Sequence, residues 1–222
     1  MPLNRPFGAL DGSAHLTQFA IVQTEKLVEA IEDYELANIP LPELLVVAID
    51  SLSSQLQNFG PADDIPLFLD SGLGPQAIID NNLEVAWHLS ACVYFHNRIN
   101  NSFINDVSFA VNTILMCLLR AEELKTLVEP DLMYRDEPAT FPAFVASCNA
   151  VDRRPWMYWW RWVQQYDLLN VNATWMTIKV IWQIMDETQV DGEPDLSWVE
   201  ILQGPAAVPM HLSTVFEAFG FY

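Results

Sequence analysis

Positive charge is scarce in this chain of 222 residues, which carries 10 Lys and Arg against 29 Asp and Glu and has a formal net charge of −19. Proteins that bind DNA or RNA concentrate Lys and Arg against the phosphate backbone, whereas a surface this acidic repels phosphates. We therefore expect no direct nucleic-acid contact from this chain. Solubility is the first interpretation of the acidity, and a surface meant for a basic partner is the alternative.

Cysteine, glycine and long apolar runs are also scarce. The three cysteines, Cys92, Cys117 and Cys148, lie far apart in apolar surroundings, which is typical of reduced, buried thiols in an intracellular protein. With 8 glycines in the chain, no glycine-rich phosphate loop occurs. We expect no signal peptide and no membrane span, because the uncharged run at 107–119 is too short to cross a bilayer. No Lys/Arg cluster indicates a nuclear import signal.

Apolar residues recur at helical spacing along most of the chain, and 51% of all residues are hydrophobic. This predicts an all-α protein, a multi-helix bundle of about eight to ten helices with a sizeable core. We expect residues 1–12 to be a flexible tail and 13–222 to be a single domain that contains an ordered connector at 60–75. The predicted helices are one that begins at 13 and is stopped by Pro40, and others at 43–58, 76–99, 103–128, 155–168 and 172–187.

Tryptophan is concentrated in the stretch 141–187, which holds six of the eight tryptophans. Pro155 suits the first turn of a helix, and Trp156, Trp159 and Trp160 follow it at helical spacing. Asn172 is a suitable N-cap for the next helix, which carries Trp175 and Trp182 on its apolar face. Two helices with bulky stripes and a short loop between them predict an antiparallel helical hairpin.

Core packing is the first interpretation of this aromatic stripe, and the lining of an apolar ligand cavity is the second. The arginines of the same stretch allow two interpretations as well. They either pair with the abundant carboxylates and cap a preceding helix, or they anchor an anionic group of a ligand or an acidic partner. The candidate ligand or partner contacts are Arg154, Trp159, Arg161 and Trp175.

The order of segments in the second half of the chain resembles a known family. An apolar segment that ends in a turn with a cysteine (FPAFVASCNAVDRR) is followed by the tryptophan-rich helix, a helix that reaches IWQIMDE, an acidic gap and SWVEIL. With VYFHNRI at 93–99, this order resembles the C-terminal part of the fungal-specific transcription factor regulatory domain, over residues 76–204. The six-cysteine zinc cluster that binds DNA in that family is absent here. If the resemblance holds, the chain is either cut from a longer regulator or a protein that lacks this module.

The resemblance implies a non-enzymatic, effector-sensing regulatory domain that controls transcription and is located in the nucleus. Its expected partners are an apolar small-molecule effector, regulatory proteins or a second copy of the chain, without any cofactor. Two alternatives stay open. One is an α-helical enzyme or carrier with an aromatic-lined apolar cavity, and the other is a dimerisation scaffold with an exposed aromatic patch.

Two patterns could carry metal chemistry. His88, Cys92 and His96 share one face of a predicted helix and offer the nitrogen and sulfur ligands that zinc prefers. Because they are splayed roughly 6 Å apart along the helix, a buried cysteine between two ordinary histidines is the preferred interpretation. Asp63-Asp64 resembles the aspartate-rich motif of α-helical terpene synthases, but it lies in a predicted loop and the second motif is missing. No catalytic, metal or cofactor-binding residue is assigned.

Overall fold

The computed structural model describes residues 15–58, 72–99, 107–166, 171–191, 196–205 and 208–210. Within these residues all regular elements are helical, which confirms the predicted all-α fold. The elements are α1 (His15–Leu36), α2 (Glu43–Asn58), α3 (Pro75–Ile99), α4 (Val107–Val128), α5 (Thr140–Cys148), α6 (Arg154–Val163), the short 3-10 helix η2 (Gln164–Tyr166), α7 (Val171–Asp191) and α8 (Trp198–Gln203). The first four predicted residues of the fourth helix, 103–106, and the pair Asp63-Asp64 lie outside the described residues.

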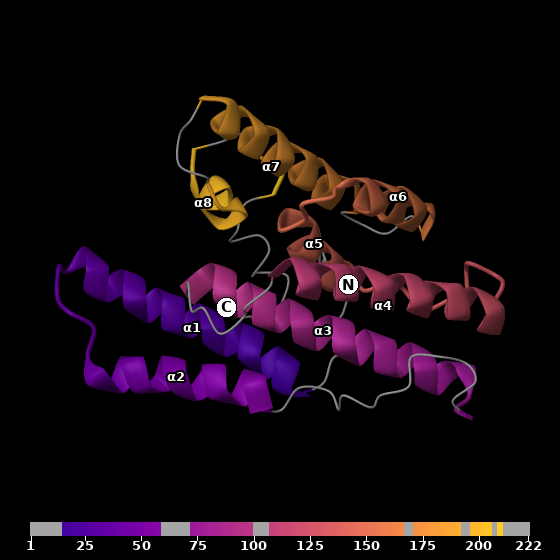
Figure 1. Cartoon of the computed structure of the whole chain (residues 1–222), viewed down its shortest axis with the longest axis horizontal. Coiled ribbons are helices and arrows are strands. Elements are labelled where there is room, and N and C mark those ends of the chain that lie inside the picture. The colour runs from indigo at the N-terminus through magenta and orange to yellow at the C-terminus, as the bar shows by residue number, and fades with distance from the viewer. Residues whose placement is uncertain are drawn as a thin grey trace, which may run out of the picture.

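The long helices α3 and α4 form an antiparallel pair across the middle of the molecule (Figure 1). Ile78 and Ile79 in the first turn of α3 pack against Ala121 and Leu124 near the end of α4. The second half of α3 is apolar on most sides, and the whole run 90–95 is buried. This is the environment expected of a helix without a consistent polar face.

The helix α5 is buried at all nine of its positions. Its Phe141 stacks on Trp87 of α3 with 5.5 Å between the ring centroids, and its Phe144 meets Trp198 of α8 edge-on at 5.6 Å. Because α5 also packs against α4 and α7, it joins the α3–α4 pair to the layer of α6, α7 and α8 above it (Figure 1).

Ser147 in the last turn of α5 accepts hydrogen bonds from two tryptophans. The indole N–H of Trp160 in α6 donates to the Ser147 hydroxyl at 2.9 Å, and that of Trp182 in α7 donates to the Ser147 carbonyl oxygen at 2.9 Å. A buried indole N–H without a partner costs about 1–3 kcal/mol. One buried residue therefore satisfies both donors and fixes α6 and α7 on α5.

A second polar contact joins α3, α5 and α8. Asn97 of α3 and Asn149, which follows α5, exchange two amide hydrogen bonds of 3.1 and 2.9 Å. The oxygen of Asn97 also accepts the indole N–H of Trp198 at 3.0 Å. Ser197 and Glu200 form a capping box at the start of α8, so this six-residue helix has a defined beginning.

Contacts at both ends of the α6–α7 pair confirm the predicted antiparallel hairpin. Arg153 before α6 binds Asp186 late in α7 at 2.8 Å, and Gln164 after α6 donates to the side chain of Asn172 early in α7 at 2.8 Å. The prediction that Asn172 is the N-cap is wrong. The helix already includes Val171, and the Asn172 side-chain oxygen accepts from Gln164 instead.

The predicted end of the α7 helix at 187 is also too early, because α7 continues to Asp191. The hydroxyl of Thr188 bonds to the carbonyl oxygens of Ile184 and Met185, within the preceding turn. A threonine that returns its hydroxyl to the helix backbone in this way satisfies its polar group without leaving the helix. Residues 188–191, which follow the predicted end of this helix, are therefore helical.

The hairpin of α1 and α2 is attached to α3 chiefly through α1. Arg98 of α3 donates to both carboxylate oxygens of Glu25 in α1, at 2.8 and 3.0 Å, and Tyr94 donates to the same carboxylate. Burial raises the pKa of Tyr94, and the charge of Glu25 adds to this, so the phenol stays a neutral donor. The hairpin turns at Asn38, whose φ of 53° lies in the left-handed region that asparagine tolerates.

Replacing Ser147 with Ala should lower the free energy of unfolding by about 1–3 kcal/mol, because the Trp160 indole N–H would stay buried without a partner. Both side chains are fully buried, so water cannot substitute. Urea unfolding followed by circular dichroism measures the change. Ser54→Ala on the exposed side of α2 is the matched control. Equal stability of the two variants would contradict the role of the Ser147 hydroxyl.

We expect none of the three thiols to react in the native chain. Cys92, Cys117 and Cys148 are free and buried. Burial raises the pKa of Cys92 to about 12, that of Cys117 to about 11 and that of Cys148 well above its ordinary value. Since the thiolate is the nucleophile, Ellman's reagent at about pH 8 should find no reactive thiol before denaturation and three after it. A fast-reacting thiol in the native chain would disprove this packing.

Candidate functional site

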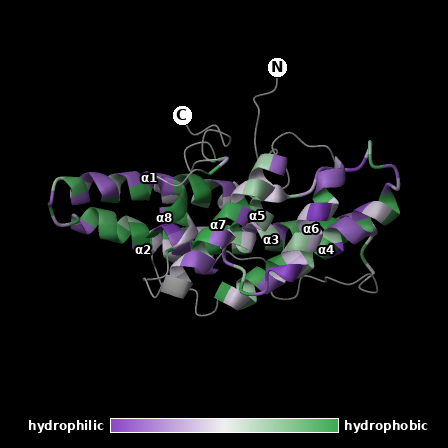
Figure 2. Cartoon of the chain, turned by 90° about the horizontal axis from the view of Figure 1, so that it is seen from above, coloured by the Kyte–Doolittle hydropathy of each residue, from purple (hydrophilic) through white to green (hydrophobic). Residues whose placement is uncertain are grey.

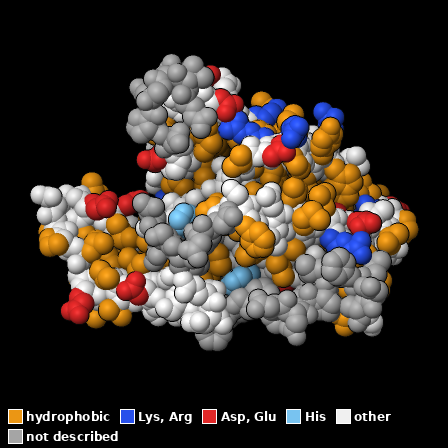
Figure 3. Space-filling model, viewed as in Figure 1, with side chains coloured by type: hydrophobic (Ala, Val, Ile, Leu, Met, Phe, Trp, Pro, Cys, Tyr) orange, Lys and Arg blue, Asp and Glu red, His pale blue; other side chains and the backbone are white. Residues whose placement is uncertain are grey.

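Most basic side chains of the described residues are already bound. Ion pairs engage five of them, and Arg135 donates to the backbone carbonyls of Glu129 and Pro130. Lys26, Arg161 and Lys179 have no ion pair with a described carboxylate. Lys and Arg atoms gather along the edge of the molecule formed by α6 and α7 (Figure 3). Two of the three cations without an ion pair therefore lie on one edge of an acidic protein.

Arg161 and Lys179 line the same groove between α6 and α7, which holds about 440 Å³. Trp175 is half-buried there, so part of its ring is available at the surface. The hydrogen bond between Gln164 and Asn172 lies across one end of the groove. The described residues that line it are Met157, Arg161, Gln164, Asn172, Trp175, Met176 and Lys179.

Trp175 connects the groove to the core. Its ring stacks on Trp160 with centroids 6.2 Å apart and 13° between the planes, and it meets Trp182 edge-on at 5.5 Å. The Lys179 ammonium lies 5.4 Å from the centroid of the Trp175 ring, within the range of a cation–π interaction. The groove thus combines an aromatic floor, which is packed on buried tryptophan, with positive charge beside it.

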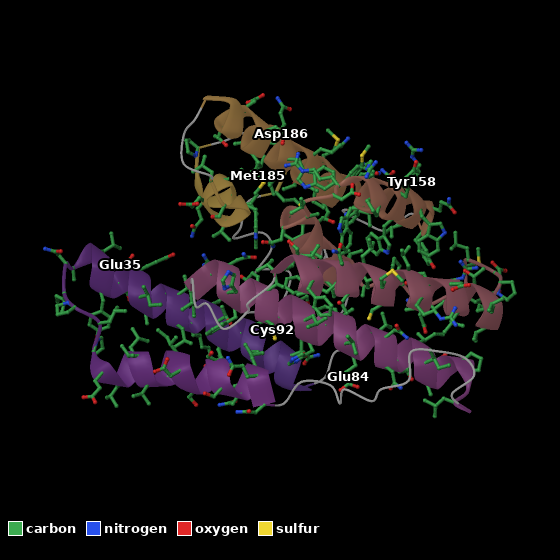
Figure 4. All side chains as sticks on the ribbon, viewed as in Figure 1. Glu35, Glu84, Cys92, Tyr158, Met185 and Asp186 are labelled. Atoms are coloured by element: carbon green, nitrogen blue, oxygen red, sulfur yellow. The ribbon has the colours of Figure 1, made fainter. Side chains whose placement is uncertain are left out.

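An ion pair and a hydrogen bond hold the residues before and after α6. Arg153 binds both oxygens of Asp186 at 2.8 Å and lies 5.4 Å from the Trp182 ring centroid (Figure 4 labels Asp186). At the other end of α6, Tyr166 donates to the buried Glu122 of α4 at 3.0 Å, and Lys125 binds the same carboxylate at 2.8 Å. The start of α6 is therefore held against α7, and the residues after its end are held against α4.

Opposing effects act on the pKa of Glu122 in the buried Glu122–Lys125 pair. Burial raises the pKa of the Glu122 carboxyl, while the positive charge of Lys125 and the hydrogen bond from Tyr166 act in the lowering direction. Lys125 also donates to the carbonyl oxygens of Asp136 and Glu137. The pair thereby fixes the segment before α5 as well as η2.

The structure brings together two of the four sequence-predicted contacts, Arg161 and Trp175. Trp159 is instead only 1% exposed and lies in the core, against the rings of Trp156 and Trp160. Its buried indole N–H has no hydrogen-bond partner among the described residues. Arg154 faces solvent with 83% of its side chain exposed and binds Asp152 at 2.9 Å. Neither Trp159 nor Arg154 lines the groove.

Lys179 and the two methionines of the groove were missed by the sequence analysis. Lys179 follows Trp175 by four residues and Met176 by three, so the three side chains lie on adjacent positions of one helix face. That spacing could have identified Lys179 and Met176 from the sequence. No sequence pattern indicates Met157, because its place opposite α7 depends on how the two helices pack.

A second hollow, of about 510 Å³, lies beside the segment after α5 and the later part of α7. Its cation, Arg153, is already bound to Asp186, a residue of the same lining. This hollow therefore presents an ion pair, whereas the α6–α7 groove presents two cations that have no ion pair with a described carboxylate. The described residues that line it are Cys148, Asn149, Ala150, Val151, Arg153, Met185, Asp186, Thr188 and Leu196.

The histidines of α3 lie apart from the groove. His88 and Cys92 are buried, with 3.5 Å between His88 Nε2 and Cys92 Sγ, and burial lowers the pKa of His88. His96 is half-buried. In the part of the chain that the structure describes, no three His, Cys, Asp or Glu residues are grouped so as to hold a metal ion. The same residues include no helix with the length and apolarity needed to cross a membrane.

Residues 17–212 match the family model described as fungal specific transcription factor domain. The matched span begins within α1 and extends beyond both ends of the resemblance found at 76–204. No curated protein sequence and no solved structure matches the chain.

The neighbouring arginines Arg153 and Arg154 should differ in their effect on stability. Arg153→Ala should lower the free energy of unfolding by about 1 kcal/mol, because it removes a partly buried ion pair to Asp186 and the contact with the Trp182 ring. Arg154→Ala should cause no measurable change, since its pair with Asp152 is solvent-exposed. Thermal and urea unfolding of both variants test this. The reverse order would refute the assigned contact between Arg153 and α7.

Proposed function

Since the chain belongs to the fungal specific transcription factor domain family, we propose that it is a non-enzymatic domain that controls transcription by binding an effector in the α6–α7 groove. The family assignment supports a regulatory role and, in general, the absence of enzymatic activity. One observation carries the choice of site. Two cations without an ion pair among the described residues flank a half-buried tryptophan, on a chain whose formal net charge is −19.

The chemistry of the groove favours an effector with an apolar body and an anionic group. Trp175, Met157 and Met176 offer apolar and aromatic contact, while Arg161 and Lys179 offer charge-assisted hydrogen bonds to a carboxylate or phosphate. The sequence analysis expected an apolar effector and kept open that an arginine anchors an anionic group of a ligand. The two cations of the groove change this proposal to an amphipathic anion.

The lining of the groove also supports the non-enzymatic interpretation over the enzyme or carrier alternative. None of the seven described residues that line it is Asp, Glu, His or Cys, so these residues supply no carboxylate, imidazole or thiol for general acid–base or nucleophilic chemistry. A nuclear location follows from the regulatory role of the family and is part of the proposal. Self-association of the chain as a dimerisation scaffold stays a prediction.

Binding of an aromatic carboxylate tests the proposed function. We expect 2-naphthoate to change the tryptophan fluorescence of the chain in a saturable manner and to raise its melting temperature, because ligands that bind the native state stabilise it. The uncharged 2-naphthamide has the same ring and should bind more weakly. Arg161→Gln and Lys179→Gln should each weaken naphthoate binding by about fivefold, equal to about 1 kcal/mol.

Lys26→Gln is the matched control, since Lys26 is an exposed cation without an ion pair among the described residues and lies on α1. It should leave naphthoate binding unchanged. Equal binding of the acid and the amide, or equal effects of all three substitutions, would exclude the groove as an anion site.

A further inference from the structure

The free ends of α1 and α2 expose apolar side chains that no other described residue of the chain covers. Leu36 is 86% exposed and Leu44 is 84% exposed, and Ile39 and Val47 are more than half exposed. None of the residues 39–51 is buried. In both views the free end of the hairpin extends beyond the other helices (Figures 2 and 3), and Figure 3 shows hydrophobic atoms at its surface there. We call this surface the hairpin tip; its residues are Leu36, Ile39, Leu41, Leu44, Val46 and Val47.

Such a surface needs a partner on physical grounds. The first half of α2 is apolar on nearly every side, from Leu44 to Ile49, and a helix of this kind is normally buried. A large contiguous patch of exposed apolar side chains on a soluble protein usually marks an interaction site. The buried residues of α2 are Leu52, Ser53 and Leu56 in its second half, and the half-buried Ile49 also packs against the core.

Negative charge surrounds the hairpin tip. The stretch 29–50 contains six acidic residues and no Lys, Arg or His. All six are exposed, and none forms an ion pair with a described residue. Figure 4 labels one of them, Glu35, at the free end of α1. The six are Glu29, Glu32, Asp33, Glu35, Glu43 and Asp50.

This charge decides what covers the apolar residues. A second copy of the chain in a symmetric dimer would bring the same carboxylates of two tips together, and like charges in an interface oppose association. Lipid and nucleic-acid phosphates are repelled for the same reason. The complement of the tip is an apolar stripe flanked by Lys and Arg. An amphipathic helix with a basic polar face presents both on one element.

We propose that the hairpin tip docks a basic amphipathic helix of a partner protein. Apolar side chains of that helix pack against Leu36, Leu44 and Val47, and its Lys and Arg residues pair with carboxylates such as Glu32 and Glu43. The tip belongs to α1 and α2, whereas the groove belongs to α6 and α7, so this interaction does not depend on the effector site.

Two synthetic helical peptides of about 18 residues, five turns long, test the proposal on the full chain. Both carry leucine at i, i+3, i+4 and i+7, and their remaining positions are lysine in one peptide and glutamate in the other. We expect the lysine peptide to bind saturably in isothermal titration and to bind more weakly as salt is added. The glutamate peptide should not bind.

Substitutions at the tip locate the binding. Leu44→Ser should weaken binding of the lysine peptide by about tenfold, because a buried leucine contact is lost. Met116→Ser on α4 is the matched control, since Met116 is 66% exposed and lies on a helix outside the hairpin. Circular dichroism verifies that both variants stay folded, as expected for exposed positions.

Several outcomes would overturn the proposal. One is equal binding of the lysine and glutamate peptides, and another is no binding by either. A third is an equal effect of Leu44→Ser and Met116→Ser. A dimer in sedimentation velocity that Leu44→Ser dissociates would show that the tip takes a second copy of the chain instead.

Discussion

The nine buried residues of α5 are the constraint from which the arrangement of the other helices follows. A helix that is covered on all sides must contact several neighbours, and α5 meets α3 through Phe141, α8 through Phe144, and both α6 and α7 through Ser147. A polar atom that is buried in this region destabilises the fold unless it has a hydrogen-bond partner. The hydroxyl and the carbonyl oxygen of Ser147 meet that requirement for two indoles at once. These two hydrogen bonds therefore fix the position of α6 and α7 relative to α5.

The α6–α7 groove is a consequence of this packing. Indole rings are wide, and Trp160, Trp175 and Trp182 lie in contact between the two helices. Where those rings do not fill the space at the surface, a hollow remains whose floor rests on the core. A floor of stacked and hydrogen-bonded aromatics loses little conformational freedom when a ligand arrives, which lowers the entropic cost of binding. The charges beside it come from exposed positions that the core does not constrain.

The helix pattern was readable from the sequence where turn residues and helical spacing agreed. The predicted helix at 43–58 coincides with α2, and that at 76–99 begins one residue after α3 does. α5 could not be read in this way, because TFPAFVASC is apolar at almost every position and has no polar face to set a period. The choice between Arg153 and Arg154 likewise depended on Asp186, a residue 33 positions further along the chain. Trp159 and Trp175 have the same chemistry, and their different exposure is decided by tertiary packing alone.

The positions of the charged residues say more about the partners of this domain than its net charge does. Solubility would be served by carboxylates placed anywhere on the surface, yet six of them surround the most exposed apolar residues of the hairpin, in a stretch with no basic residue. The basic residues show the opposite arrangement, since Arg153, Arg154, Arg161 and Lys179 all belong to the α6–α7 region. General solubility explains neither concentration. Each is what an apolar surface requires when it must select a partner of opposite charge, because apolar contact supplies affinity without direction and the surrounding charge supplies the discrimination.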